Sequence, residues 1–220
     1  MLNSIKNIVY KILYRVYLWS TSENTEGIEI SERIIEYPFA LKHLITLPKG
    51  SKIAILGCHG DMLTSLLSEL GYSVTGIDVK NFTYTHDNFT FIISDLRDMK
   101  DIESGYFNAV AAISTIEHVG LFDGDTDGDL KAVKEMRRIL KPNGLFIITV
   151  PFAKNETVIE LHERIYSNEN IERLLKNITV VKKEAVSYNN GMWHKIPIEK
   201  VPVTEGKTTT CVCMVAAKKT

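Results

Sequence analysis

Glycines and acidic residues follow the short apolar runs of this sequence in an order that suits a nucleoside-containing ligand. Gly57-Cys58-His59-Gly60 follows the first run, Asp78 ends the second, and Asp95 and the segment Ser114–His118 follow the next two. Glycine lets the backbone approach a ligand closely, and the first turn of a helix offers free N–H groups. A carboxylate about 20 residues after the glycine accepts hydrogen bonds from ribose hydroxyls. These residue types predict a site for a nucleoside cofactor.

Alternating strand and helix patterns must position these residues. Continuously apolar runs are typical of strands buried on both faces of a parallel sheet, and the helical patterns between them supply the cover. We therefore predict a doubly wound α/β fold with a mostly parallel sheet, helices on both faces and an antiparallel last strand. In such sheets ligands bind at the carboxyl ends of the strands. The predicted strands are residues 52–57, 72–78, 89–94, 107–114, 145–150, 179–187 and 208–216, and the predicted helices are 30–47, 61–70, 130–140 and 168–176.

Local signals set the ends of these elements. In helix 30–47, Ser31 is a plausible N-cap, and Pro38 predicts a kink or the start of a second piece. The Lys-Pro-Asn-Gly turn at 141–144 is expected to stop helix 130–140 before the next strand begins. Residues 188–207, with Trp193 and two prolines, are expected to form a long loop that serves as an acceptor pocket or a dimer contact.

Residues 1–19 have an amphipathic helical pattern in which apolar residues alternate with Lys6, Lys11 and Arg15. These charges exclude a secretory signal and a membrane-spanning segment. Two interpretations stay open: the helix packs on the domain or on a partner, or it lies on an anionic membrane surface. We favour packing, because soluble amphipathic helices are commoner. The chain is accordingly divided into a helix and linker at 1–27 and one domain at 28–220.

The composition is that of a globular protein that needs no cross-link or structural metal. The 220 residues are 45% hydrophobic and 24% charged, which excludes a disordered or fibrous protein. The net charge of −1 gives no general attraction to nucleic acid. The three cysteines are an odd number without framework or zinc-ligand spacing. They predict a reduced, cytoplasmic compartment and no metal site.

Ordered motifs in this chain resemble those of the class I S-adenosylmethionine-dependent methyltransferases. They are GCHG at 57–60, GID at 76–78, SDL at 94–96, STIEHV at 114–119 and LKPNG at 140–144. The resemblance spans about residues 34–150 and implies S-adenosylmethionine as the cofactor. EYP at 36–38, IEHVGL at 116–121 and HERIY at 162–166 resemble a poorly characterised microbial branch, some members of which are associated with modifying glycans or other small molecules.

The resemblance implies roles at the nucleoside end of the cofactor. Asp78 would hold the ribose hydroxyls, with Val79 beside the adenine. Asp95 would accept a hydrogen bond from the adenine amino group, and the Leu96 N–H would bind a ring nitrogen.

The resemblance also implies roles at the methionine end. The Gly57–Gly60 loop would face the methionine part, and Ser114-Thr115-Ile116 would line the floor under the sulfonium. Glu36-Tyr37-Pro38 would cover the site from the N-terminal side, with Tyr37 as a candidate acceptor contact.

The glycine loop departs from the family's usual pattern. Ile55 stands where the family usually has an acid, and His59 and Asp61 stand where it usually has glycine. Asp61 is a candidate to supply the missing charge near the methionine ammonium. The departures favour an alternative function, a non-catalytic partner protein that keeps the fold and has lost the site. NAD is a weaker candidate cofactor, because His59 and Met62 interrupt the G-x-G-x-x-G pattern.

Four residues are candidates for acting on the acceptor. His118 follows the fourth strand with Glu117 adjacent, and we predict that His118 is a base for a hydroxyl acceptor or positions that acceptor. In the purely structural interpretation, these two side chains only hold neighbouring loops. His162 and Arg164 form a second cluster. Arg164 clamps a carboxylate or phosphate of the acceptor, or it makes a surface ion pair.

An acidic segment at 123–128 matches the first half of a calcium-binding loop. Its twelfth position is Lys134 instead of glutamate, so we expect these acids to cap the following helix. The sequence as a whole predicts an S-adenosylmethionine-dependent methyltransferase, cytoplasmic and able to form a homodimer. The predicted acceptor is a hydroxyl, or less often an amine, of a small molecule or glycan.

Overall fold

The computed structural model describes residues 31–159, 162–204 and 209–219. The predicted helix and linker at 1–27 lie outside these residues, so their packing or membrane binding stays a prediction. Over the described ranges, no helix has the length and apolar character needed to cross a membrane.

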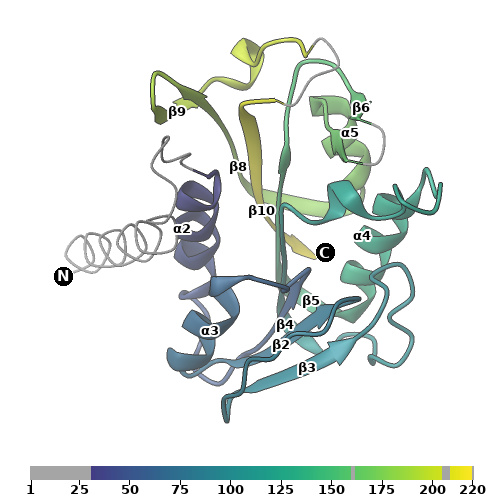
Figure 1. Cartoon of the computed structure of the whole chain (residues 1–220). Helices are drawn as coiled ribbons and strands as arrows, with labels where there is room; N and C mark the ends of the chain where they lie inside the picture. Colours follow the sequence, from purple (N-terminus) through teal and green to yellow (C-terminus); the bar gives the residue numbers. More distant parts are fainter. Residues whose placement is uncertain (1–30, 160–161, 205–208, 220) are drawn as a thin grey trace.

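In the part of the chain that the structure describes, an eight-stranded mixed sheet forms the centre of the fold (Figure 1). Its strand order is β3-β2-β1-β4-β5-β10-β8-β9. The first five strands pair in parallel, and β10 runs antiparallel to both β5 and β8. The predicted fold class, including the antiparallel last strand, is confirmed. The strands of this sheet are β1 (Lys52–Leu56), β2 (Ser73–Asp78), β3 (Phe89–Ile93), β4 (Phe107–Ile113), β5 (Leu140–Pro151), β8 (Ile178–Asn189), β9 (Met192–Ile196) and β10 (Cys211–Lys219).

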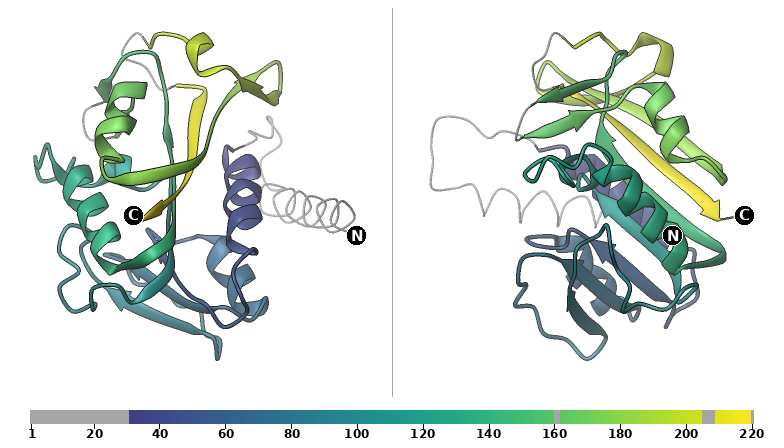
Figure 2. Two further views of the ribbon diagram at one scale, coloured as in Figure 1. Left: turned by 180° about the vertical axis from the view of Figure 1, so that it is seen from behind. Right: turned by 90° about the vertical axis from the view of Figure 1, so that its right-hand side faces the viewer.

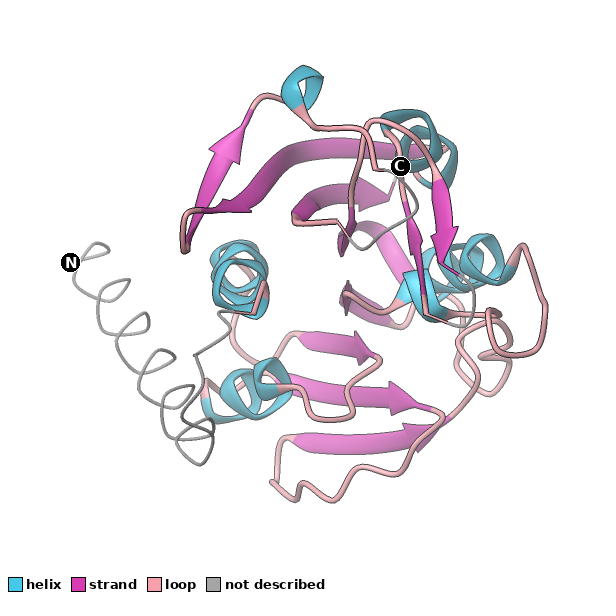
Figure 3. Ribbon diagram, turned by 45° about the horizontal axis from the view of Figure 1, so that its top comes forward, coloured by secondary structure: helices cyan, strands magenta, loops and turns pink. Residues whose placement is uncertain are grey.

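Helices cover both faces of the sheet, as Figures 2 and 3 show. The residues of β1 alternate between two hydrophobic clusters, one on each face: Ala54 and Leu56 pack with α4 and α5, whereas Ile53 and Ile55 pack with α2 and α3. Since a buried parallel strand presents side chains to both faces, an apolar residue at position 55 is what the core requires. The helices are α2 (Arg33–Leu44), α3 (Met62–Glu69), α4 (Gly128–Ile139), α5 (Asn168–Leu174) and the 3₁₀ turns η1 (Ile116–His118) and η2 (Ile198–Lys200).

The first described helix differs from its prediction at its start and at Pro38. Its N-cap is Glu32, one residue later than predicted, although the Ser31 Oγ accepts a hydrogen bond from the Arg33 N–H at 3.3 Å. α2 runs through Pro38 as one element. The neighbours Tyr37 and Phe39 are buried, and their packing on the sheet offsets the backbone hydrogen bond that proline cannot make.

The Lys-Pro-Asn-Gly segment lies inside β5 instead of forming a separate turn. Phe107 pairs with Leu140 and Ala109 pairs with Leu145, so the register shifts within β5. Asn143, with a φ of 59°, supplies the left-handed residue that such a bulge needs. The helix therefore stops at Ile139 and the strand starts at once.

The predicted loop at 188–207 is wrong for its first half, because β9 forms a hairpin with β8 and becomes an edge of the sheet. The hairpin turn is Asn190-Gly191, with φ values of 50° and 77°. Asn-Gly is a strong signal for a two-residue hairpin turn, and the sequence prediction missed it. A second small hairpin, β6 (Thr157–Ile159) with β7 (Glu163–Ile165), was also not predicted.

Candidate active site

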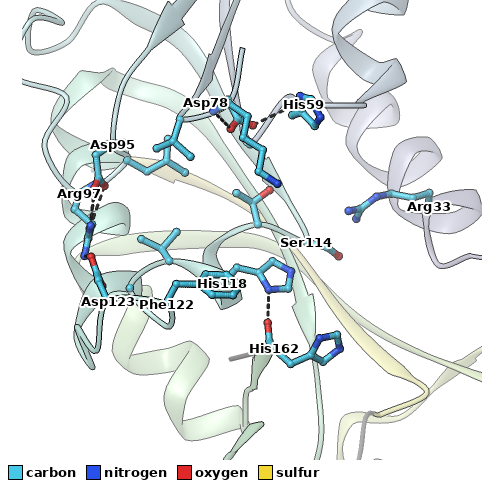
Figure 4. A pocket seen from close by; sticks show the side chains of 17 residues that line it. Arg33, His59, Asp78, Asp95, Arg97, Ser114, His118, Phe122, Asp123 and His162 are labelled. Carbon is cyan, nitrogen blue, oxygen red and sulfur yellow. Dashed lines mark hydrogen bonds and ion pairs between the residues drawn. The ribbon is translucent and has the colours of Figure 1, made fainter. Parts of the chain in front are cut away.

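A cavity of about 630 Å³ lies where the parallel strands β1 to β4 end (Figure 4). Its wall comes from the segments that follow these strands, with further contributions from α2 and from residue 162. The structure thus brings most of the predicted site residues to one place, and their roles stay predictions. Those that line the cavity are Gly57, His59, Asp78, Val79, Asp95, Leu96, Ser114, Thr115, His118 and His162.

The glycine loop needs its first glycine for two reasons. Gly57 has a φ of 69°, and a Cβ there would lie 2.3 Å from the Thr115 Cγ2 atom. Any larger residue would therefore clash with the Thr115 side chain and would be strained at this φ. Cys58 and Gly60 were also predicted to face the cofactor, but neither lines the cavity. The Cys58 side chain is buried, and its thiol lies so close to Gly76 that a Cβ there would clash with it.

The Asp78 carboxylate ties the glycine loop to the end of β2. Its Oδ2 accepts a hydrogen bond from the His59 N–H at 3.0 Å, and its Oδ1 accepts one from the Lys80 N–H at 2.9 Å. An ionised carboxylate offers about four acceptor positions, so about two remain for a ligand. The side chain is 8% exposed and lines the cavity, so a group bound in the cavity can reach these acceptor positions.

Arg97 joins the end of β3 to the acidic loop at 123–128. Its guanidinium binds Asp95 in a bidentate pair with a shortest distance of 2.6 Å, and it also lies 2.6 Å from the Asp123 carboxylate. These hydrogen bonds hold the pKa of Asp95 below its usual value. The prediction that the acids cap α4 is wrong for Asp127, which occupies the N-cap without a side-chain hydrogen bond. Asp125 instead contacts Lys131 at 2.8 Å.

The His118 imidazole is held in one orientation at the cavity wall. Its Nδ1 lies 2.6 Å from the His162 main-chain oxygen, which can only accept, so Nδ1 carries the proton in this bond (Figure 4). The Nε2 atom then keeps its lone pair. Burial lowers the pKa of His118 below its usual 6.5, which favours the neutral ring. The arrangement provides a neutral imidazole whose basic nitrogen is Nε2.

The predicted catalytic role of Glu117 is wrong in its direct form. Its side chain is 1% exposed and is absent from the cavity wall. Its Oε1 lies 3.8 Å from the His118 Nε2, beyond a hydrogen bond, and its Oε2 has no partner among the described residues. Burial raises the pKa of Glu117 well above its usual value, which favours the neutral form of the group. Ile116 is likewise fully buried in the core instead of lining the floor.

Arg164 does not reach a methyl acceptor, because its guanidinium donates hydrogen bonds to backbone carbonyls. It is 6% exposed and donates to the main-chain oxygens of Val119 at 2.6 Å and Asp125 at 3.0 Å, with longer contacts to those of Glu117 and Thr126 at 3.4 Å. The predicted clamp for a carboxylate or phosphate is therefore wrong. Arg164 instead anchors on β7 the loop that carries His118.

We expect the substitution Arg164→Met to lower the free energy of unfolding by about 3–5 kcal/mol. The change leaves buried carbonyls without their charged donor, and each such hydrogen bond contributes about 1.5–3 kcal/mol. Urea denaturation measures the difference. Arg173→Met, at an exposed position of α5, is the control and is expected to change stability by less than about 0.5 kcal/mol. Equal stabilities of the two variants would contradict an anchoring role.

Tyr37 and Asp61 point to each other instead of into the cavity. The Tyr37 hydroxyl hydrogen-bonds to the Asp61 carboxylate, which also accepts from the Leu63 N–H at 2.6 Å and so caps α3. Burial raises the pKa of Asp61 to about 6. Neither side chain lines the cavity. The suggestions that Tyr37 contacts an acceptor and that Asp61 replaces the missing acid are therefore not supported by this geometry.

Several residues of the cavity wall were not predicted from the sequence. Phe122 is a large apolar side chain that is 74% exposed at the mouth, and Arg33 reaches in from α2. Arg33 lies one helical turn before Glu36, and that spacing was the available signal for their ion pair. Phe122 carries no local signal, since an exposed phenylalanine in a loop has no periodicity. The unpredicted wall residues are Arg33, Lys80, Arg97, Val119, Gly120, Phe122 and Asp123.

Sequence comparison identifies one domain family and two mammalian relatives. The methyltransferase domain family matches residues 55–148. The mitochondrial ubiquinone biosynthesis O-methyltransferase of Mus musculus is 29% identical over 178 residues, covering 66% of this chain and 46% of that protein. The protein of the same name from Rattus norvegicus is 27% identical over 178 residues, covering 66% of this chain and 50% of its own length. This chain therefore spans about half the length of the curated relatives it matches.

Comparison with solved structures places the fold among methyltransferases. The 1,6-didemethyltoxoflavin-N1-methyltransferase of Burkholderia thailandensis, solved with S-adenosylhomocysteine, has a TM-score of 0.63 at 13% identity, with 99% of this chain and 90% of that one covered. The [4+2]-cyclase SpnF has the same TM-score at 15% identity, with 90% and 84% covered. At such identities these similarities establish the fold alone.

Proposed function

Because the chain belongs to the class I S-adenosylmethionine-dependent methyltransferase superfamily, whose cofactor is S-adenosylmethionine, we propose that it transfers a methyl group to a hydroxyl of a small molecule. The observation that carries the proposal is the His118 imidazole, neutral and oriented at the wall of the cavity formed by the strand ends. The hydroxyl acceptor is supported by the O-methyltransferases among the relatives. A glycan hydroxyl belongs to the same chemical class.

The residues of the cavity fit the cofactor. Asp78 has about two free acceptor positions for ribose hydroxyls, and Val79 and Leu96 supply apolar surface beside them. The positive φ of Gly57 brings the backbone of the loop close to the ends of β2 and β4. When bound, S-adenosylmethionine supplies an activated methyl group and needs little further chemistry from the protein.

The chain's own residues then act on the acceptor. The cavity walls hold the acceptor hydroxyl near the His118 Nε2 and exclude water from it. His118 takes the hydroxyl proton on Nε2 while Nδ1–H stays bonded to the His162 carbonyl, which stabilises the resulting imidazolium. The Arg164 contacts fix the loop that carries His118.

A second candidate function rests on the departures in the glycine loop. Ile55 is buried in the core, and Asp61 caps α3, so neither places a carboxylate at the methionine end. The fold is also that of a protein described as a [4+2]-cyclase, so the fold does not by itself specify methyl transfer. The rival proposal is a non-catalytic partner protein that keeps the fold and has a changed cofactor loop.

Isothermal titration of the intact protein separates the two candidates. Micromolar affinity for both S-adenosylmethionine and S-adenosylhomocysteine supports the methyltransferase. A folded protein that binds neither compound supports the rival. Methyl transfer from labelled cofactor to a panel of phenols, glycans and amines then identifies the acceptor atom.

We also propose a cytoplasmic location and a homodimer. The three cysteine thiols are free and buried, which suits a reducing compartment. The exposed edge strand β9 is a surface through which two copies can pair. Light scattering of the intact chain and of a variant with Met192 replaced by lysine tests the pairing.

A further inference from the structure

A buried carboxylate, Glu36, lies directly behind the cavity wall. Its Oε1 accepts a hydrogen bond from the Ser114 hydroxyl at 2.6 Å, and its Oε2 accepts one from the Arg33 guanidinium at 2.5 Å. Ser114 and Arg33 both line the cavity, whereas Glu36 does not. Glu36 is completely buried, so it acts on a ligand through these two groups.

The hydrogen bond to Glu36 determines whether the Ser114 hydroxyl can donate or accept toward the cavity. A hydroxyl has one proton to donate and two lone pairs. Since the Ser114 proton is used by Glu36, the remaining capacity of the Oγ atom is for accepting a hydrogen bond. Ser114 also holds a φ of 39°, which is unusual outside glycine, and its N–H donates to the Thr149 hydroxyl at 2.9 Å. The hydroxyl is therefore fixed in place as an acceptor.

The second oxygen of the same carboxylate fixes a cation, the Arg33 guanidinium. Arg33 uses one guanidinium nitrogen for Glu36, and Figure 4 shows its guanidinium directed toward Ser114 at the cavity wall. Glu36 bonds both groups, so a hydrogen-bond acceptor and a positive charge stand side by side. This pair complements a group with an ammonium next to a carboxylate, as in a free amino acid.

We propose that Glu36 is a positioning residue for the amino-acid end of the cofactor. It fixes the Ser114 oxygen to accept from the ammonium and the Arg33 guanidinium to bind the carboxylate. The inference rests on the proposed use of S-adenosylmethionine. It also explains how the site functions with Ile55 in the core and Asp61 at the helix cap.

The substitution Glu36→Gln tests this role, because glutamine keeps the shape and cannot accept from both donors. If its NH₂ group faces Ser114, the serine proton turns to the cavity, and if it faces Arg33, the cation is displaced. We expect the dissociation constant of S-adenosylhomocysteine to rise roughly 10–100-fold. The dissociation constant of 5′-methylthioadenosine, which lacks the amino-acid group, is expected to change by less than about twofold.

Matched variants keep this test independent of folding. Glu32→Gln makes the same chemical change at the N-cap of α2, one turn before Glu36, and is expected to alter neither of these dissociation constants. Ser114→Ala removes the acceptor together with one hydrogen bond of Glu36, but it keeps the carboxylate and its pair with Arg33. It is expected to weaken S-adenosylhomocysteine alone by roughly 5–20-fold. This variant decides the question if Glu36→Gln does not fold.

Two results would overturn the inference while leaving the proposed function in place. One is an equal loss of affinity for both nucleosides together with a lower melting temperature, which a purely structural role predicts. The other is unchanged affinity for S-adenosylhomocysteine in the folded Glu36 and Ser114 variants. Wild-type protein that binds neither nucleoside would instead overturn the proposed function, and this inference with it.

Discussion

Replacing His118 with alanine is expected to lower the turnover rate of methyl transfer by roughly 10²–10⁴-fold while cofactor affinity stays nearly unchanged. A positioned base contributes about that factor to a step in which a hydroxyl loses its proton. The side chain lies at the wall of the cavity, and the His162 carbonyl holds its ring. Steady-state kinetics with saturating acceptor, together with titration of S-adenosylhomocysteine, measure the two quantities separately.

The pH profile gives a second measure of the same role. Burial lowers the pKa of His118, so the ring stays neutral and able to accept a proton below its usual pKa of 6.5. The rate of the wild-type enzyme is therefore expected to fall only on the acidic side of pH 6.5, as the ring becomes protonated. This acidic limb should disappear in His118→Ala. A profile that keeps its shape while the Michaelis constant rises would show that His118 only positions the acceptor.

His162→Ala is the matched control for His118. His162 also lines the cavity, but its contact with His118 uses the main-chain oxygen, which alanine retains. We expect the turnover rate of His162→Ala to differ from that of the wild type by no more than a few-fold. If the His162 variant loses the rate and the His118 variant keeps it, the two assigned roles are reversed. If neither loses more than a few-fold, proximity alone performs the catalysis.

Sequence patterns located the cavity because it is formed at strand ends. Apolar runs define where parallel strands stop, and the topology brings these ends to one edge, so Gly57, Asp78, Asp95 and Ser114 converge. The direction of a side chain in a turn is not fixed by such patterns. His118 faces the cavity and its neighbour Glu117 faces the core, because η1 turns successive side chains to different sides.

Contacts between distant segments account for the rest of what the sequence did not predict. Glu36 meets Ser114 across 78 positions of the chain, and Arg97 pairs with Asp123 in the loop before α4. The sequence predicts that Arg164 either clamps the acceptor or makes a surface ion pair, and a long cation is rarely buried. It is buried because the loop before α4 presents carbonyls that need donors.

Asp78→Ala is expected to weaken the binding of S-adenosylhomocysteine by roughly 10–150-fold. Hydrogen bonds from ribose hydroxyls to a charged acceptor contribute about 1.5–3 kcal/mol, and each 1.4 kcal/mol is a factor of ten. Titration calorimetry measures the constant directly. Asp78 also accepts from the His59 and Lys80 N–H groups, so part of any loss can come from a loosened glycine loop.

A nucleoside without ribose hydroxyls separates these two contributions. The 2′,3′-dideoxy form of S-adenosylhomocysteine cannot donate to Asp78, so it is expected to bind wild type and Asp78→Ala with affinities within about threefold. A loosened loop would weaken both compounds equally in the variant, since each needs the same loop. Asp78→Asn is expected to resemble alanine, because its NH₂ group would meet the N–H groups that the carboxylate now accepts from. An unchanged constant for S-adenosylhomocysteine in Asp78→Ala would refute the ribose assignment, and then the spare acceptor positions of Asp78 bind some other donor.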